Sequence, residues 1–229
     1  MKLYRHIFFS LLIFSVVLPS NINTKPFALL NSLHNNNGWE IIKFDNDVSV
    51  STKRILDKNL LGVMVKKELS LPKEILQNVI MDINNYSNFL KGSSYFISKE
   101  LKKTSEFVEG YQFIPINIPF FDNREYLFRM YPNGFKDGDN TSIIHWYLLD
   151  KDVKYLERDN QTAIYLSHGA GLWVAEKKSN DKTQFSYRIY MDPGGSLPSF
   201  LIDLINKTSV VNIFRDAISE AQKRYEYSN

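Results

Sequence analysis

Apolar and polar residues alternate between positions 183 and 191, and this period of two predicts a β-strand with one apolar face. The apolar face consists of Phe185, Tyr187, Ile189 and Met191. The strand leads into the turn sequence Asp192–Leu197 (DPGGSL), where Gly194 and Gly195 permit the backbone dihedrals of a sharp reversal. The glycine pair is compatible with a plain turn and with a hinge for the element that follows.

A helical period follows this turn and predicts a long C-terminal helix from Pro198 to Tyr225. Pro198 suits the first turn of a helix, where its missing amide hydrogen costs nothing. One stripe at spacings of three and four carries mainly apolar residues: Leu201, Leu204, Thr208, Val211, Phe214, Ile218, Ala221 and Tyr225. Because the apolar strand face needs an apolar partner, we expect this helix to fold back over the sheet.

The rest of the chain predicts seven further strands and one further helix. The helix begins at Pro72 and has an apolar face that includes Ile80, Tyr86 and Leu90. The strands are expected at 48–51, 60–69, 94–101, 106–113, 124–131, 142–149 and 162–176. Short polar turns between them indicate antiparallel neighbours. Strands that follow one another, with helices kept apart, are typical of a single α+β domain.

The first twenty residues are typical of a secretory signal peptide, because Lys2 and Arg5 precede an apolar stretch from residue 7 to 18. A helix of that length spans roughly 18 Å, which is shorter than the ~30 Å hydrocarbon core of a bilayer. An uncleaved membrane anchor is the alternative. We expect residues 21–37 to form an N-terminal segment or linker and residues 38–229 to form the domain, in a secreted or periplasmic protein.

Composition limits the chemistry available. The chain has no cysteine, which excludes disulfides and a lipoprotein attachment site. Lys2 and Arg5 account for two of the net +3 charges, so the remaining domain carries +1 and has no basic cluster typical of nucleic-acid binding. Four histidines at unrelated spacings predict no metal site, and no nucleophile elbow or phosphate-binding glycine loop is present. The glycines at 169 and 171 indicate a bulge or bend in their strand. We expect no cofactor, no catalytic residue and a monomer.

Five short pieces of sequence together resemble the START family, the steroidogenic acute regulatory protein-related lipid-transfer domains, and in particular its bacterial secreted members. These pieces are Gly38–Glu40 (GWE), Asp82–Phe89 (DINNYSNF), Asn123–Tyr126 (NREY), Gly171–Trp173 (GLW) and Asp192–Leu197 (DPGGSL). Their order and spacing carry the resemblance, which spans roughly residues 38 to 225. It implies a helix-grip (START-like or Bet v 1-like) fold, in which a curved antiparallel sheet wraps the C-terminal helix and leaves a hydrophobic tunnel for a lipid.

One departure from the family is the pair Arg124–Glu125, because members often carry Arg-Asp at this place. The longer glutamate alters the geometry of any polar contact that the pair makes.

The alternation along the strands predicts which side chains face the helix. Ile144, Trp146 and Leu148 (or their alternates) and Phe185 join the predicted inner face. We expect ligand contacts from Arg124, Tyr126, Phe128, Met130, Trp146, Tyr165, Tyr187, Ile189, Met191, Leu201, Leu204 and Thr208. Arg124, Tyr165, His145 and His168 are the candidates for a polar head group. The alternation is equally compatible with a dry, filled core, and the family resemblance is what favours a hollow one.

The expected function is therefore exported, non-catalytic binding or transfer of a lipid or another hydrophobic small molecule. A secreted polyketide cyclase, aromatase or hydrolase-like enzyme of the same fold is the alternative, and an envelope interaction protein with a filled cavity is a third. The apolar segment Ile114–Phe121 contains two prolines and cannot be a central strand. It would suit either transient membrane contact or a buried connection under the sheet edge.

Overall fold

The computed structural model describes residues 25–45, 47–55, 61–91, 96–116, 121–133, 140–152, 163–178, 181–195 and 209–228. The expected signal peptide at 1–20 and the predicted ligand contacts Leu201, Leu204 and Thr208 lie outside these ranges. No helix within the described ranges combines the length and the apolar character needed to cross a bilayer.

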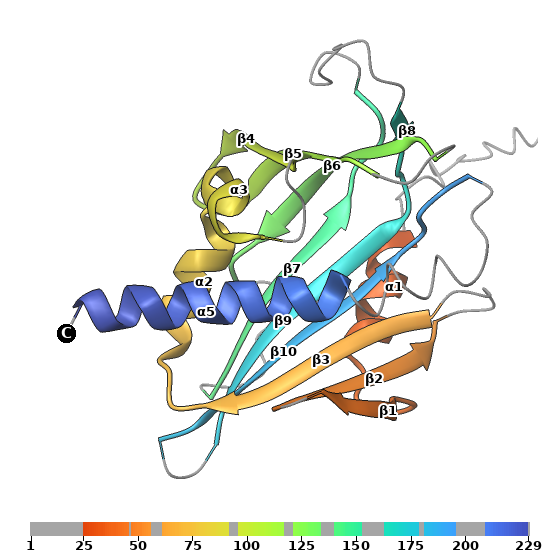
Figure 1. The fold of residues 1–229 in the computed structure, drawn as a ribbon. Helices are drawn as coiled ribbons and strands as arrows, with labels where there is room; N and C mark the ends of the chain where they lie inside the picture. Colours follow the sequence, from red (N-terminus) through yellow and green to blue (C-terminus); the bar gives the residue numbers. More distant parts are fainter. Residues whose placement is uncertain are drawn as a thin grey trace, which may run out of the picture.

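A single curved sheet of ten strands, counted over the described residues, forms the body of the molecule (Figure 1). Its strand order is β1-β2-β3-β10-β9-β7-β6-β5-β4, and every neighbour in this order is antiparallel. The short strand β8 lies off this path and pairs with β6 in parallel. The strands are β1 (Glu40–Asp45), β2 (Val48–Arg54), β3 (Leu61–Leu69), β4 (Ile97–Lys103), β5 (Val108–Ile114), β6 (Asn123–Tyr131), β7 (Thr141–Leu148), β8 (Ala163–Tyr165), β9 (Gly169–Lys177) and β10 (Thr183–Met191).

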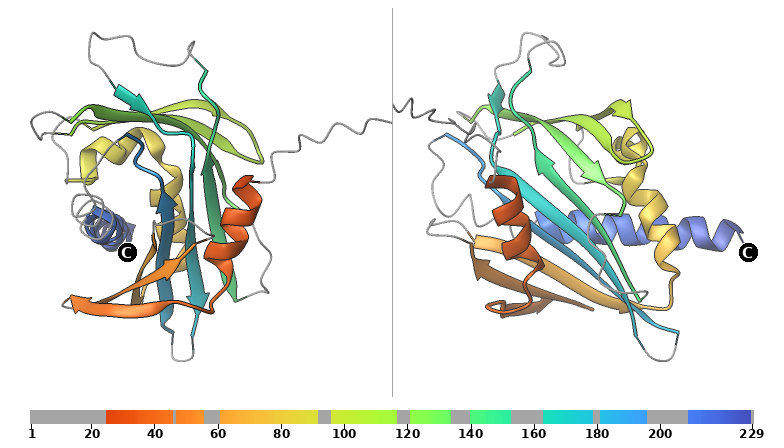
Figure 2. Two further views of the ribbon diagram at one scale, coloured as in Figure 1. Left: turned by 90° about the vertical axis from the view of Figure 1, so that its right-hand side faces the viewer. Right: turned by 180° about the vertical axis from the view of Figure 1, so that it is seen from behind.

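The sheet bends around the C-terminal helix α5 (Val210–Ser228), which is seen end-on in the left view of Figure 2. The helix α2 (Lys73–Met81), the 3₁₀ turn η1 (Ile83–Asn85) and the short helix α3 (Tyr86–Phe89) lie on the same side as α5. Helix α1 (Lys25–His34) packs on the opposite side. We call the side toward α5 the inner face and the side toward α1 the outer face. The expected α+β helix-grip architecture is confirmed.

Each face of the sheet has its own apolar core. The inner core combines the alternating side chains of the strands with one side of α2 and α5, and it includes Val65, Phe128, Trp173, Phe185 and Phe214. The outer core joins α1 to β7, β9 and β10 and consists of Leu29, Leu30, Leu33, Ile55, Ile143, Ala170, Leu172, Val174 and Tyr190. The segment 21–37, expected as an N-terminal segment or linker, therefore contains a helix that covers part of the sheet.

Three local predictions differ from the structure. The single strand expected at 162–176 is divided into β8 and β9, and β1 adds a strand before the first one expected. The helix expected from Pro72 to Leu90 ends at Met81, because Asp82 has non-helical dihedrals (φ −90°, ψ 62°). The carboxylate of Asp82 accepts hydrogen bonds from Asn85 Nδ2 at 2.8 and 2.9 Å and so stabilises the break.

Of the bulge or bend expected at the glycines of β9, the bulge is absent. Pairing with β10 runs through Gly169 and Gly171, and pairing with β7 runs through Gly171, both without a register shift. The register shifts in the described sheet lie elsewhere, between Ile41 and Lys43 and between Glu100 and Lys102. The turn glycines behave as expected, since Gly194 and Gly195 have φ values of +62° and +68° that L side chains rarely adopt.

Candidate functional site: a cavity between the sheet and the C-terminal helix

A cavity of about 310 Å³ lies between the inner face of the sheet and α5. This volume is at the lower end of the range typical of small-molecule sites, roughly 300–1,000 Å³. The described residues therefore form a hollow interior, and not the filled core that was the alternative. Most of the lining is apolar, and it contains few polar atoms.

The sheet supplies one wall of this cavity through β5, β6, β7, β9 and β10. Seven residues predicted as ligand contacts line it: Tyr126, Phe128, Met130, Trp146, Tyr187, Ile189 and Met191. Phe185, Ile144 and Leu148 share the same face but lie within the packed inner core instead. Contact with a ligand stays a prediction for all seven, but the structure brings them to one cavity.

Two glycines make room for aromatic rings on this wall. A Cβ atom added at Gly171 would lie 2.5 Å from the indole of Trp146, and one added at Gly110 would lie 2.5 Å from the ring of Phe128. Each ring therefore crosses the neighbouring strand at a distance that only glycine allows. Gly171 has this steric role in place of the bulge expected from the sequence.

The helices supply the opposite wall. Tyr86 and Phe89 of α3 make an edge-to-face contact with ring centroids 5.6 Å apart, and Val210, Ile213 and Ala217 of α5 also line the cavity. Sequence reasoning did not name these residues as ligand contacts. A signal was present for Tyr86, because the helical period placed it on the same apolar face as Ile80 and Leu90, which also line the cavity.

Three polar side chains of the described lining, Tyr86, Gln112 and Tyr126, are held by hydrogen bonds. The Tyr126 hydroxyl donates to Gln112 Oε1, and Gln112 Nε2 donates to Ser98 Oγ at 3.3 Å. The Tyr86 hydroxyl donates to the carbonyl oxygen of Ile80. All of these groups are neutral, so the wall offers hydrogen bonds without charge.

Tyr187 completes the polar wall and is held from two sides. Its ring stacks on Trp173, with centroids 4.1 Å apart and planes 14° apart, and the indole N–H of Trp146 acts as a hydrogen-bond donor to its hydroxyl. Burial raises the pKa of Tyr187, and the nearby phenols of Tyr126 and Tyr86 raise it further. Burial is also the main cause that raises the pKa of Tyr86 and of Tyr126. The three phenols are therefore protonated at physiological pH.

We use the word rim for lining residues that are exposed or partly exposed on α5 and just before it, at the end of α3, and at 114–116, where β5 ends. Ser209, Asn212 and Asp216 contribute polar atoms on the α5 side. Asp216 Oδ2 accepts the backbone N–H of Lys91 at 2.9 Å, which ties α5 to the end of α3. Ile114, Pro115 and Ile116 form the apolar part of the rim. Residues 117–120 of the apolar segment expected at 114–121 lie outside the described residues.

Arg124, predicted as a head-group contact, lies outside the cavity lining. Its side chain is 4% exposed and donates to four backbone carbonyl groups. Nε donates to Pro193 O at 2.6 Å, Nη2 to Gly194 O at 3.3 Å, and Nη1 to Asn123 O at 3.3 Å and also to Asp122 O. Arg124 therefore joins the start of β6 to the turn that follows β10.

The other three head-group candidates also lie outside the cavity lining. The Tyr165 hydroxyl donates to Leu149 O at 2.9 Å and accepts from Leu127 N–H at 3.3 Å. His145 stacks on Tyr131 at 4.8 Å, and burial lowers the pKa of His145 to about 4. His168 makes an edge-to-face contact with Tyr190 at 5.6 Å. His145 follows the alternation of β7, which turns it to the outer face when Trp146 faces inward.

The described residues contain no group of three His, Cys, Asp or Glu side chains that could hold a metal ion. Asp216 is the one Asp, Glu, Lys, Arg or His side chain among the described lining residues. The described lining therefore offers a shaped apolar surface and neutral hydrogen-bonding groups.

Comparison with known proteins supports the fold. No family model matches the sequence, and no curated protein matches it. Among solved structures, a STAR-related lipid transfer protein from Xanthomonas axonopodis superimposes with a TM-score of 0.68 at 19% identity, covering 81% of this chain and 99% of that one. Human STARD10 gives a TM-score of 0.67 at 17% identity, covering 90% of this chain and 81% of that one.

The Zhui aromatase/cyclase from Streptomyces sp. R1128 is also similar, with a TM-score of 0.51 at 14% identity over 72% of this chain and 94% of that one. These identities are low, so the likeness concerns the fold and leaves the activity open. The curved ten-stranded sheet, the gripped C-terminal helix and these neighbours together show that the chain has the START-like helix-grip fold.

Proposed function

We propose that this protein is exported and binds a lipid or another hydrophobic small molecule in the cavity between the sheet and α5, without chemical conversion, and that it transfers this molecule between membranes. The observation that carries the proposal is the mostly apolar cavity of about 310 Å³ beneath α5. Each methylene group moved from water into such a site contributes on the order of 0.8 kcal/mol. The likeness to STAR-related lipid transfer proteins supports the same function.

The rim supports a route for the ligand. Ile114, Pro115 and Ile116 place apolar atoms beside the cavity, and such atoms favour transient contact with a membrane surface. A ligand that enters from a membrane then passes between two apolar environments and avoids the cost of crossing water.

The main competing proposal is an enzyme of the aromatase or cyclase type, and it is favoured by the likeness to the Zhui aromatase/cyclase. General acid–base catalysis requires a group with a pKa near the working pH within reach of the substrate. The described lining offers phenols with raised pKa values and the carboxylate of Asp216, which already accepts the Lys91 N–H. Binding without conversion accounts for this lining more directly.

Native mass spectrometry of the purified protein tests the binding function. We expect an added mass from a co-purified hydrophobic molecule, saturable uptake of a fluorescent lipid, and lipid transfer between donor and acceptor vesicles. Recovery of the bare polypeptide together with no uptake would contradict the proposal. Conversion of a polyketide substrate would favour the enzyme.

A cavity-filling variant sharpens this test. Ile189→Trp adds a two-ring side chain to the cavity wall and should abolish uptake, because the volume for the ligand is then occupied. Ile41→Trp is the matched control, since Ile41 lies on the edge strand β1 and is 59% exposed. Circular dichroism should show both variants folded, and equal uptake by both would contradict the location of the site.

Export is tested separately. Expression of the full chain in a bacterial host, followed by intact-mass measurement of the periplasmic fraction, should show removal of about the first twenty residues. A full-length product in the membrane fraction would favour the uncleaved anchor.

A further inference from the structure

We propose that the cavity selects an uncharged, mostly apolar molecule with one hydroxyl or carbonyl oxygen, and that this oxygen lies in the interior among Tyr86, Tyr126 and Tyr187. This inference rests on the proposed binding function and specifies its ligand class. The three hydroxyl-bearing side chains are 8%, 7% and 5% exposed, and all three line the cavity.

The hydrogen bonds within this phenol group leave a defined pattern of donors and acceptors. Tyr86 and Tyr126 give their protons to Ile80 O and Gln112 Oε1, so each keeps a phenol oxygen that can accept. Tyr187 is the reverse case, because its oxygen accepts from Trp146 and its own proton has no acceptor among the described residues. A ligand hydroxyl can accept from Tyr187 and donate to Tyr86 or Tyr126, whereas a ligand carbonyl can use Tyr187 alone.

The charge of the lining argues against an anionic head group at this position. The described lining contains no Lys, Arg or His, and its one carboxylate, Asp216, lies at the rim. An ionised carboxylate or phosphate among the phenols would be desolvated without a counter-charge, which is strongly unfavourable. The raised pKa values of the phenols agree with this, because they reflect the same penalty for a negative charge.

A cationic head group is also poorly served. Recognition of a quaternary ammonium group requires open aromatic faces around it. Trp173 has Tyr187 stacked on it at 4.1 Å and Phe214 stacked at 6.0 Å with planes 9° apart, so its ring is engaged by protein. The indole N–H of Trp146 points at Tyr187 and would face a cation unfavourably.

The size of the cavity limits the apolar part of the ligand. A methylene group occupies roughly the volume of a water molecule in the liquid, about 30 Å³. A volume of about 310 Å³ therefore accommodates a chain of about ten carbon atoms, and a two-chain lipid exceeds it. Ligands with ten-carbon chains are suitable probes.

A head-group series at constant chain length tests the inference. Decane, 1-decanol, 2-decanone, decanoate and decyltrimethylammonium are titrated at pH 8, with calorimetry and tryptophan fluorescence as readouts, since Trp146 and Trp173 line the cavity. We expect 1-decanol to bind about tenfold or more tightly than decanoate, because decanoate carries an unpaired charge into the cavity. Equal or tighter binding of decanoate or decyltrimethylammonium would overturn the inference and leave the proposed function standing. Failure of the whole series to bind would contradict the proposed function itself.

Replacement of single tyrosines by phenylalanine tests where the ligand oxygen lies. Tyr187→Phe should weaken 1-decanol and 2-decanone about three- to tenfold and leave decane within about twofold, because one neutral hydrogen bond is lost. Tyr190→Phe is the matched control, since Tyr190 is a buried phenol on the outer face of the same strand and should leave all affinities unchanged. If Tyr187→Phe is unfolded, Tyr126→Phe decides, and it should weaken 1-decanol more than 2-decanone. If the affinities for 1-decanol and 2-decanone relative to decane are unchanged in both variants, the proposed position of the ligand oxygen is wrong.

Discussion

The two faces of the sheet are built from the same strands but enclose different interiors. On the outer face, α1 packs Leu29, Leu30 and Leu33, each at most 1% exposed, against the modest side chains Ala170 and Leu172 of β9. On the inner face, the same strand presents Gly171 and Trp173, and the indole of Trp146 lies across Gly171.

The difference shows how the cavity arises. Small and aliphatic residues let a helix approach the outer face closely, and close packing leaves little space. On the inner face, stacked rings stand between sheet and helix, as Trp173 does against Phe214 with centroids 6.0 Å apart. Rigid rings fill the contact points and leave the volume between them open. The cavity therefore depends on a few aromatic side chains and on the glycine that makes room for one of them.

Truncation of one aliphatic side chain on each face should give the largest difference in the free energy of unfolding. Leu33→Ala should lower the free energy of unfolding by about 2–5 kcal/mol, because the closely packed outer face cannot collapse into the space left. Ile189→Ala on the cavity wall should cost less, since Ile189 is only partly buried and already faces open volume. Urea unfolding with unchanged m-values measures both. A larger loss for Ile189→Ala would contradict the contrast between a packed face and a hollow one.

Acid should lower the stability of the protein through His145 on the outer face, and it should not change ligand binding at the inner face. The unfolded chain binds a proton at His145 near pH 6.5, whereas burial lowers the pKa of His145 in the folded protein to about 4. The folded state therefore loses stability as the pH falls from about 6.5 to 4, by on the order of 3 kcal/mol for this shift. His145→Phe keeps a ring against Tyr131 and should remove this part of the pH dependence.

The control for this prediction is ligand binding. Affinity for 1-decanol should stay constant from pH 6 to pH 9, because burial keeps the phenols of the inner face protonated. Unfolding curves at several pH values test the first part. Equal pH dependence in the wild type and His145→Phe would show that other groups govern acid sensitivity.

Gly171→Ala should change both the stability of the protein and the shape of the cavity. The added Cβ would lie 2.5–2.6 Å from the indole of Trp146 and would displace it. We expect a loss of about 1–3 kcal/mol in stability, as is usual for overpacking, together with a shifted tryptophan emission and weaker ligand binding. Gly169→Ala is the milder comparison, with nearest contacts of 3.1–3.3 Å. Identical behaviour of the two variants would contradict the specific role of Trp146.

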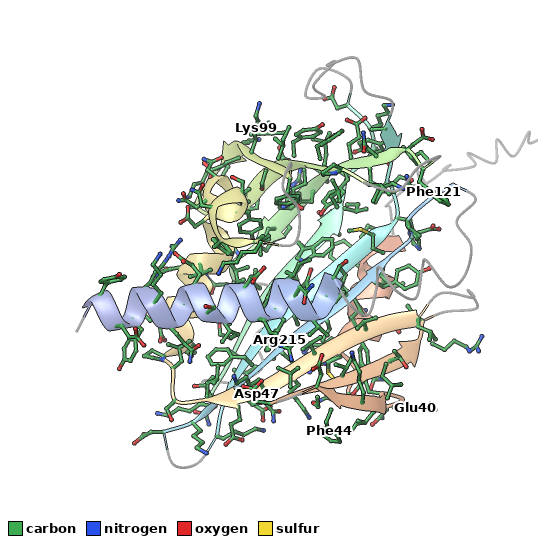
Figure 3. The ribbon with its side chains drawn as sticks, viewed as in Figure 1. Glu40, Phe44, Asp47, Lys99, Phe121 and Arg215 are labelled. Atoms are coloured by element: carbon green, nitrogen blue, oxygen red, sulfur yellow. The ribbon has the colours of Figure 1, made fainter. Side chains whose placement is uncertain are left out.

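The smallest effect should come from the ion pair that ties α5 to the edge of the sheet. Arg215 Nη2 lies 2.8 Å from Asp45 O and 3.2 Å from Asp45 Oδ1, and Figure 3 shows Arg215 on the side of α5 toward the first strands. Both side chains are about one-third exposed, so Arg215→Met should cost less than about 1 kcal/mol. The contribution of the ion pair should vanish in about 1 M salt, where charges are screened. A loss that persists there would come from the hydrogen bond to the Asp45 carbonyl or from packing by the arginine stem.

Local patterns predicted much of this structure. The period of two in β10 identified the side of the strand that carries Tyr187, Ile189 and Met191, because alternation on a strand is a geometric necessity. The same rule excludes His145 as a ligand contact once Trp146 faces the cavity, since neighbours on a strand point to opposite faces. The expectation of Trp146 as a ligand contact, with His145 as a candidate for the polar head group, overlooked this rule.

The remaining differences come from tertiary structure. The division of 162–176 into β8 and β9 depends on pairing with β6, a strand about forty residues away. The role of Gly171 depends on a ring from β7, which no pattern within β9 contains. Two of the four carbonyl partners of Arg124, Pro193 and Gly194, belong to the turn after β10. No pattern near position 124 shows them, so the charge of Arg124 looked available for a ligand.

The bridge made by Arg124 has a consequence for sequence change at this position. One planar guanidinium donates to the carbonyl groups of Asp122 and Asn123 on one segment and of Pro193 and Gly194 on another. A lysine ammonium is a single compact point with three donors and cannot span both segments in this way. Lysine at position 124 would keep the charge and lose the bridge, so the two basic residues are not equivalent where the sheet meets its final turn.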